Sequence, residues 1–105
     1  MDEVFKALAN PTRRALLDRL REENGQSLGE LCQRLDMSRQ GVSKHLALLE
    51  AAGLVVTFWE GRTKLHYLNP APIGEIYDRW IEKFERSRER ALRELKIQLE
   101  EESDV

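Results

Sequence analysis

The sequence contains a single cysteine, Cys32, in 105 residues. One thiol cannot form a disulfide bond within the chain, so a reducing compartment such as the cytoplasm is the expected location. No apolar run approaches the roughly 20 residues that a membrane-spanning helix requires. The first residues, Met1-Asp2-Glu3, lack the basic start and apolar stretch of a signal peptide. We therefore expect a cytoplasmic protein that has no membrane partner.

The groups that usually carry catalysis are also missing. The sequence has no glycine-rich phosphate loop, no Cys-x-x-Cys pair and no grouped serine, histidine and acidic residues. We therefore predict no catalytic residues and no cofactor. His45 and His66 have no cysteine or carboxylate at ligand spacing, which argues against a metal site.

A large excess of positive charge is absent too, since 17 basic residues stand against 19 acidic ones. The basic residues are nevertheless concentrated in one part of the chain. Residues 38–67 hold four basic and two acidic side chains, and they are the only third of the sequence with a positive balance. A local basic patch of this kind is sufficient for docking on nucleic acid.

Capping signals predict where the first helices begin. Asn10 before Pro11 is typical of a helix N-terminus, because the missing N–H of proline costs nothing at the first helical position. We expect that helix over residues 11–23. Ser27 and Glu30 form a capping box of the Ser-x-x-Glu type, which predicts a third helix from this point through Leu35.

The following helix carries the strongest functional signal. Ser38 is its predicted N-cap and Gly53 closes it, while Val42, Leu46 and Leu49 recur at spacings of four and three to form one apolar stripe. Most polar residues lie off this stripe and are of the types that contact base edges and phosphates. The predicted DNA-binding residues of this helix are Ser38, Arg39, Gln40, Ser43, Lys44 and His45. With the short helix before it, the segment is a predicted helix-turn-helix over residues 27–52.

The hydrophobic period then changes from that of a helix to that of strands. Two runs rich in β-branched and aromatic residues, 54–59 and 63–68, flank a turn at Glu60-Gly61-Arg62. We predict a β-hairpin wing over residues 54–68, which makes the chain a mainly α, winged helix-turn-helix protein. Arg62 and Lys64 near the tip are expected to contact phosphates or a minor groove.

The last part of the sequence predicts one helix over about residues 72–101, roughly 45 Å long. Its apolar residues follow three-four spacing with an interruption near Ser87 and Arg88. A single apolar stripe on so long a helix needs a partner surface, and a second copy of the chain supplies one. We predict a homodimer through this last helix, with these residues at the interface: Tyr77, Trp80, Phe84, Ala91 and Leu95.

Several segments resemble those of the ArsR-type winged-helix repressors. Leu8-Ala9-Asn10-Pro11-Thr12-Arg13 is similar to the N-terminal signature of that family, and the run from Met37 to Leu49 is similar to its recognition helix. Ala52-Gly53-Leu54-Val55 and Gly61-Arg62 with Tyr67-Leu68 resemble the two ends of its wing. The resemblance covers residues 2–70 and implies a homodimeric transcription factor, usually a repressor, whose first and last helices form the dimer interface. In the first helix, the implied interface residues are Val4, Phe5 and Leu8.

The chain departs from the metal-sensing members of that family. The resemblance puts their two cysteine ligands at Ser27 and Gly29, and no histidine follows His66 to build their second site. The pattern therefore resembles the metal-independent, SdpR-like branch. It leaves the inducing signal open.

Our interpretation is a single winged-helix domain over residues 1–105 that binds a palindromic operator in double-stranded DNA. We expect it to repress its own or a neighbouring operon. Two alternatives remain at this point. One is a winged-helix adaptor that binds another protein, and the other is a repressor that responds to thiol oxidation or metal through Cys32.

Overall fold

The computed structural model describes residues 1–33 and 35–103. The helices and strands, in chain order, are α1 (Asp2–Leu8), α2 (Pro11–Glu22), α3 (Leu28–Cys32), α4 (Arg39–Ala51), β1 (Val55–Glu60), β2 (Thr63–Leu68), α5 (Ala71–Trp80) and α6 (Glu82–Ser103). They form two compact units, Met1–Ile73 and the segment from Gly74 onward. The first unit is the mainly α winged helix that the sequence predicts. The single domain expected over the whole chain stays a prediction.

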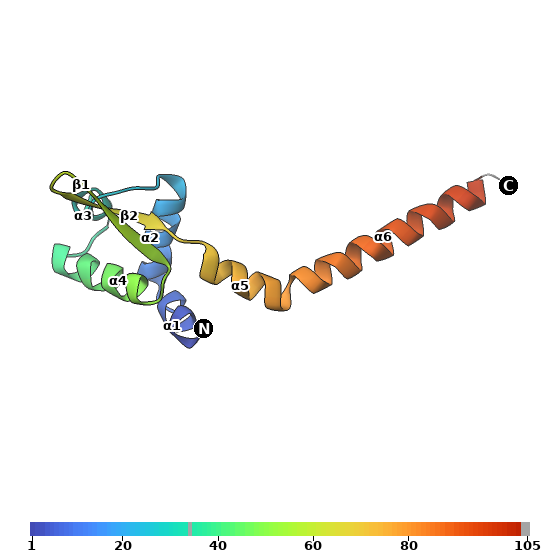
Figure 1. Cartoon of the computed structure of the whole chain (residues 1–105), viewed down its shortest axis with the longest axis horizontal. Helices are drawn as coiled ribbons and strands as arrows, with labels where there is room; N and C mark the ends of the chain where they lie inside the picture. Colours follow the sequence, from blue (N-terminus) through green and yellow to red (C-terminus); the bar gives the residue numbers. More distant parts are fainter. Residues whose placement is uncertain (34, 104–105) are drawn as a thin grey trace. The chain divides into compact units, whose positions relative to one another are not determined.

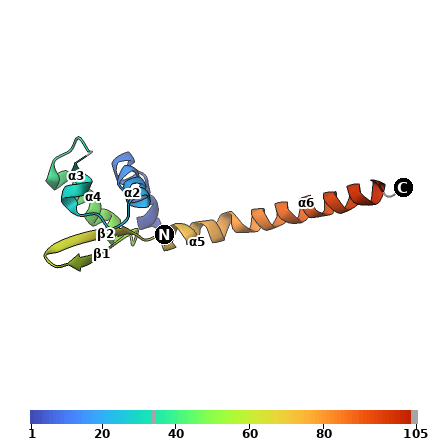
Figure 2. The same cartoon turned by 90° about the horizontal axis from the view of Figure 1, so that it is seen from above.

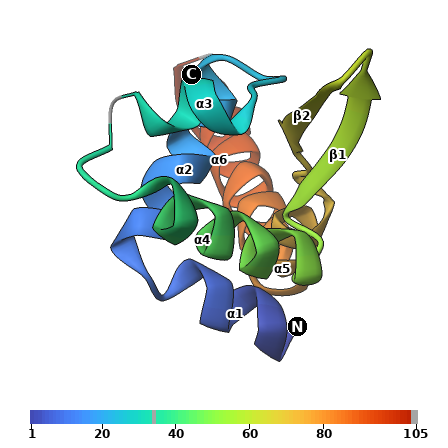
Figure 3. The ribbon, with the colours of Figure 1, turned by 90° about the vertical axis from the view of Figure 1, so that its left-hand side faces the viewer.

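The first unit is built around α4. Helices α1, α2 and α3 and strand β1 all pack against it, and the hairpin extends beside the helices (Figures 2 and 3). The largest fully buried side chains come from α2, α3, α4 and the start of the hairpin, and they are Leu16, Leu20, Leu31, Val42, Leu49 and Leu54. Each contributes about 1.5–3 kcal/mol relative to an exposed position. This core fixes which face of α4 is left for solvent.

Residues at the start of α2 hold α1 in place. The side chain of Asn10 accepts hydrogen bonds from the backbone N–H groups of Thr12 and Arg13, at 2.9 and 3.1 Å, which confirms the predicted cap. The guanidinium of Arg13 donates to the carbonyls of Lys6 and Ala7 at the end of α1. A positively charged donor at a helix C-terminus satisfies the last carbonyl groups, and its charge interacts favourably with the negative end of the helix dipole.

Helix α3 begins where the capping box predicts and ends earlier than expected. Ser27 Oγ accepts from the N–H of Glu30, and Glu30 Oε1 accepts from the N–H of Ser27, both at 3.2 Å. The predicted extension through Leu35 is wrong, because α3 ends at Cys32. The chain has to leave the helix before Ser38, which adopts an extended conformation in order to cap α4. Arg34 lies outside the described residues.

Two glycines with positive φ, Gly53 and Gly61, end α4 and form the turn of the hairpin. Gly53, with φ +76°, donates to the carbonyl of Glu50, and Leu54 donates to that of Leu49, which is the hydrogen-bond pattern of a Schellman motif. The strands are antiparallel and pair Val55 with Leu68 and Glu60 with Thr63, so β1 begins one residue later than predicted. The turn consists of Gly61 and Arg62 alone. Gly61 has φ +62°, which suits the first position of a type II′ turn.

The root of the hairpin is tied to the loop after α2 by two buried polar residues, Gln26 and His66. The backbones of these residues exchange hydrogen bonds of 3.2 and 2.8 Å, and His66 Nδ1 lies 2.9 Å from the carbonyl oxygen of Gln26. Because a carbonyl only accepts, Nδ1 of His66 carries a proton and donates in this contact. The amide of Gln26 donates to the carbonyls of Arg19 and Glu23 at the end of α2. The sequence analysis placed His66 on the wing and missed its burial.

The second unit consists of most of α5 together with α6. The single helix predicted over 72–101 is wrong, because α5 ends at Trp80 and α6 begins at Glu82 (Figure 1). Hydrogen bonds from Ile81 N–H to Tyr77 O and from Glu85 N–H to Ile81 O nevertheless continue the helical pattern through this point. None of the described side chains of α5 and α6 is buried. Within residues 1–33 and 35–103, no helix has the length and apolar character needed to cross a membrane.

Candidate nucleic-acid interface

Helix α4 presents two different faces. Val42, Leu46 and Leu49 are between 0% and 2% exposed and lie in the core of the unit. The residues away from the core are exposed and include Arg39, Gln40, Ser43, Lys44 and Ala47, together with the apolar Leu48. These donors and acceptors are the types that bind base edges and phosphates in a major groove. The core packing therefore leaves most of the predicted DNA-binding residues on one accessible surface.

The first turn of α4 explains two residues at this surface. Ser38 Oγ accepts a hydrogen bond of 3.0 Å from the N–H of Gly41, so its hydroxyl acts as the helix cap. A Cβ at Gly41 would lie only 3.0 Å from Met37 Cε and 3.3 Å from Ser38 Oγ. Gly41 therefore leaves room for the residues that start the helix. A DNA contact by Ser38 stays a prediction.

His45 is held by a residue that the sequence analysis did not select. Arg13 Nη1 lies 3.3 Å from His45 Nδ1. Because a guanidinium only donates, Nδ1 accepts and the ring proton of neutral His45 is on Nε2. The same side chain binds the last carbonyls of α1, so Arg13 connects α1 to the middle of α4. Sequence spacing alone gave no signal for this contact, because the two residues are 32 positions apart.

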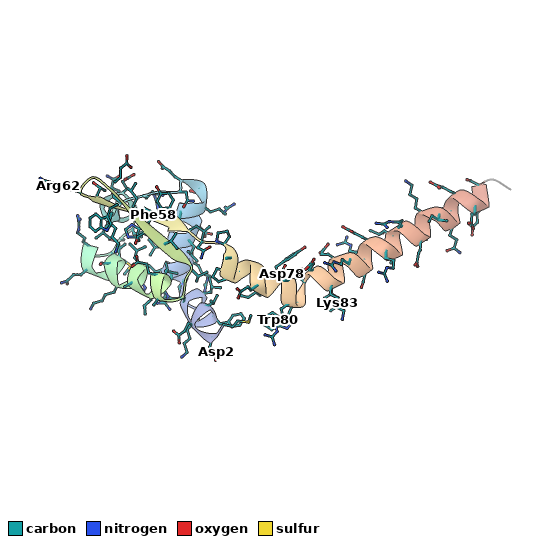
Figure 4. The ribbon with its side chains drawn as sticks, in the orientation of Figure 1. Asp2, Phe58, Arg62, Asp78, Trp80 and Lys83 are labelled. Atoms are coloured by element: carbon teal, nitrogen blue, oxygen red, sulfur yellow. The ribbon has the colours of Figure 1, made fainter. Side chains whose placement is uncertain are left out.

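The two basic residues of the wing differ in their surroundings. Arg62 is exposed at the tip of the hairpin, as Figure 4 shows. Lys64 Nζ lies 3.5 Å from Glu50 Oε1 on α4, and both side chains are partly exposed. A partly exposed ion pair of this type contributes about 0.2–1 kcal/mol. Lys64 thus joins the wing to α4, in addition to any contact with phosphate.

A cleft of about 550 Å³ separates α4 from the wing. Residues from the start of α3, from the exposed face of α4 and from both strands line it, including Ser27, Arg39, Ser43, Trp59, Arg62 and Lys64. The side chain of Trp59 is 67% exposed. The cleft brings Arg39 and Ser43 of α4 and Arg62 and Lys64 of the wing onto one concave surface, which the acidic Glu50 also lines.

The two positions at which the resemblance places the metal-binding cysteines, Ser27 and Gly29, have a different role here. Ser27 is committed to capping α3, and Gly29 has no side chain to offer. Cys32 is half-buried. Among the described residues, no three His, Cys, Asp or Glu side chains lie close enough together to hold a metal ion.

Some of the residues predicted for dimerisation are buried within the chain, and others are exposed. Val4 is 7% exposed and lies in the core of its own unit, whereas Phe5 is 43% exposed. Leu8 is half-buried. The predicted interface residues of α5 and α6, which are Tyr77, Trp80, Phe84, Ala91 and Leu95, are all exposed.

Comparison with known proteins agrees with this geometry. A helix-turn-helix domain family matches residues 8–57. The HTH-type transcriptional regulator YuzN of Bacillus subtilis (strain 168) is 40% identical over 87 residues, which cover 77% of this chain and 95% of that protein. The transcriptional repressor SdpR of the same organism is 32% identical over 84 residues, covering 80% of this chain and 91% of that protein.

A solved structure is similar over almost the whole chain. The ArsR-like transcriptional regulator from Rhodococcus sp. RHA1 has a TM-score of 0.71 and 33% identity, and the match covers 95% of this chain and 90% of that one. The fold and the sequence similarity extend well beyond the helix-turn-helix. The chain therefore belongs to the ArsR family of winged helix-turn-helix transcriptional regulators.

Proposed function

We propose that the chain binds a palindromic DNA operator as a homodimer and represses its own or a neighbouring operon in the cytoplasm. Relatives that are similar over most of their length are transcriptional regulators, and SdpR is a repressor by name. The observation that carries the proposal is the exposed face of α4, which presents Arg39, Gln40 and Lys44 and of which Arg39 lines the same cleft as Arg62 of the wing.

The side chains divide into two roles in this proposal. Gln40 can form two hydrogen bonds with adenine and Arg39 two with guanine, each worth ~1–3 kcal/mol of discrimination. Lys44, Arg62 and the Nε2–H of His45 suit phosphate oxygens, which fix the position of the protein without reading sequence. Ser43 lines the same cleft and can contact either.

Homodimerisation places one α4 in each half-site, so the half-sites should be about one helical turn, or a multiple of it, apart. Phe5 and Leu8 of α1 and the exposed apolar residues of α5 and α6 supply the proposed interface. Val4 supports α1 from within the core. A chain that stayed monomeric while binding specifically would contradict this arrangement.

The deciding experiment measures fluorescence anisotropy with DNA from upstream of the gene for this chain and with a scrambled duplex. We expect tight binding to the first only, lost in an R39A/Q40A double variant and retained in R93A, which changes an arginine of α6. Equal affinity for both duplexes would contradict operator recognition. Failure to bind any duplex would instead favour the protein-binding adaptor.

The same assay tests the responsive alternative through Cys32. Adding oxidant or divalent metal ions should leave the affinity of the wild type unchanged, because the described residues form no metal cluster and Cys32 is half-buried. Release from DNA in the wild type but not in C32S would establish a thiol or metal switch.

A further inference from the structure

Trp59 places a large aromatic ring on the same surface as the basic residues of the proposed DNA site. Its side chain is 67% exposed, so most of the indole is in contact with water. An aromatic ring of this size contributes strongly to binding when a partner covers it, and its N–H remains available as a hydrogen-bond donor. The position therefore favours a role for Trp59 in binding over a role in the core.

The strand register shows which face of the wing carries Trp59. Trp59 pairs with Lys64 across the hairpin, and His66 lies two residues further along the same strand as Lys64. Because opposite residues and residues two apart share one face of a sheet, these three side chains lie on the same side. All three line the cleft between the wing and α4. Phe58 lies on the other face, where its ring meets that of Tyr67 edge to face at 5.6 Å.

The cleft has positive charge on both of its walls. Arg39 lines it from α4, and Arg62 and Lys64 line it from the wing. The acidic Glu50 also lines it, but its carboxylate lies 3.5 Å from Lys64 Nζ, which reduces the repulsion that it exerts on an anion. A molecule that fits this cleft has to offer negative charge to both walls and apolar surface to the indole of Trp59.

A sugar–phosphate strand of duplex DNA has this combination of properties. In the proposed complex, α4 enters a major groove and the tip of the wing reaches the neighbouring minor groove. One backbone strand separates two neighbouring grooves, so this strand has to pass through the cleft between α4 and the wing. Its phosphates supply the negative charge, and the C–H groups of each deoxyribose supply apolar surface.

We propose that Trp59 binds the backbone strand that separates the two grooves. The face of the indole packs against a deoxyribose, and Nε1–H, which can only donate, binds a phosphate oxygen. This inference rests on the proposed function and adds an uncharged residue to the DNA contacts. Because sugar and phosphate are the same at every base pair, Trp59 contributes affinity and position but no sequence preference.

Anisotropy titrations of W59A with operator and scrambled duplexes test this role, at a low salt concentration where both duplexes are bound. W59A should weaken binding to both about tenfold, because the apolar contact and the phosphate bond are lost together. The slope of log affinity against log salt should stay at the wild-type value, since an indole displaces no counterion. W59F, which keeps a ring without the N–H, should weaken binding about threefold.

F58A is the matched control. Phe58 is 62% exposed and lies one residue from Trp59, on the opposite face of the same strand. F58A should bind both duplexes as the wild type does, with far-UV circular dichroism confirming that both variants are folded. Equal losses in W59A and F58A would overturn the role of Trp59. A loss in W59A that is confined to the operator would also overturn it, because such a loss indicates a contact that reads bases.

Tryptophan fluorescence gives a second measurement, which leaves Trp59 intact. The chain has two tryptophans, Trp59 and Trp80, so W80F retains Trp59 alone. On addition of duplex DNA, the emission of Trp59 should shift to shorter wavelength and its quenching by acrylamide should decrease, because the indole leaves water. Unchanged emission and quenching, while anisotropy shows that the duplex is bound, would contradict the contact.

The preference of the wild type for operator DNA keeps the two proposals separate. If the wild type prefers the operator while W59A binds both duplexes as tightly as the wild type, the contact of Trp59 is wrong and the proposed function stands. If the wild type binds both duplexes equally while W59A loses affinity for both, operator recognition fails and the contact stands. If the wild type binds no duplex, both proposals fail.

Discussion

Replacing Arg13 with alanine removes three hydrogen bonds from the junction of α1, α2 and α4 in one step. Two of them go to the carbonyls of Ala7 and Lys6, at 2.8 and 2.9 Å, and the third goes to His45 Nδ1 at 3.3 Å. A hydrogen bond to a charged group is worth about 1.5–3 kcal/mol. Because the site is only partly buried, we take about 1 kcal/mol for each carbonyl bond and less for the longer contact.

The expected loss is therefore about 2–3 kcal/mol in the free energy of unfolding. For a unit of this size, such a loss lowers the melting temperature by about 10–20 °C. Urea unfolding followed by circular dichroism measures it, at several protein concentrations so that dimerisation can be separated. R14A is the matched control, since Arg14 makes one exposed bond, to the carbonyl of Leu8, and should cost about 0.5–1 kcal/mol.

A stability loss in R13A no greater than that in R14A would refute this reasoning. Nitrogen-15 NMR adds a readout of the histidine itself. In the wild type the neutral ring of His45 should carry its proton on Nε2, and in R13A the two tautomers should mix because the donor to Nδ1 is gone. An unchanged tautomer in R13A would show that another group orients the ring.

Four further predictions concern DNA binding, folding and association. Q40A should weaken operator binding by ~1–3 kcal/mol and leave random DNA unaffected, and equal losses on both would contradict a base contact. K64A should weaken binding to all DNA and reduce the salt slope by about one per protomer, whereas an unchanged slope would mean that Lys64 serves only its ion pair with Glu50. G53A should cost about 1–2 kcal/mol in urea unfolding, because its φ of +76° disfavours a Cβ although the nearest atom is 3.8 Å away. W80A should weaken the dimer in sedimentation while far-UV circular dichroism shows an intact winged unit, and a fully dimeric variant would contradict that role.

The sequence predicted the features that depend on local chemistry. Helix starts at Asn10, Ser27 and Ser38 were confirmed, because a capping side chain bonds to backbone groups only two or three residues away. The turn at Gly61 was found for the same reason, since a positive φ favours glycine wherever it occurs. Local signals were also sufficient for the exposed face of α4, whose apolar stripe sets which residues face the core.

Features that depend on distant partners were missed. The contact of Arg13 with His45 and the burial of His66 against Gln26 join residues 32 and 40 positions apart, so no pattern within one helix or strand reveals them. The break at Ile81 has no proline or glycine nearby to announce it. Which side chains of α4 touch bases and which touch phosphates stays a prediction, because it depends on the DNA.

The wing is anchored mainly at its root, and this has a mechanical consequence. Its root is fixed by His66 and Gln26, by Asn24, which accepts from the N–H of Leu68, and by Asn69, which donates to the carbonyl of Gly53. Towards the tip, the wing contacts α4 through the partly exposed ion pair of Lys64 with Glu50, and Arg62 itself is exposed. Because the root of the hairpin is fixed, its tip can move further than its root. The tip can therefore follow a wider or narrower groove while the position of α4 stays unchanged. In the proposed complex, we therefore expect the protein to tolerate variation in DNA shape at its wing while α4 keeps its position on the bases.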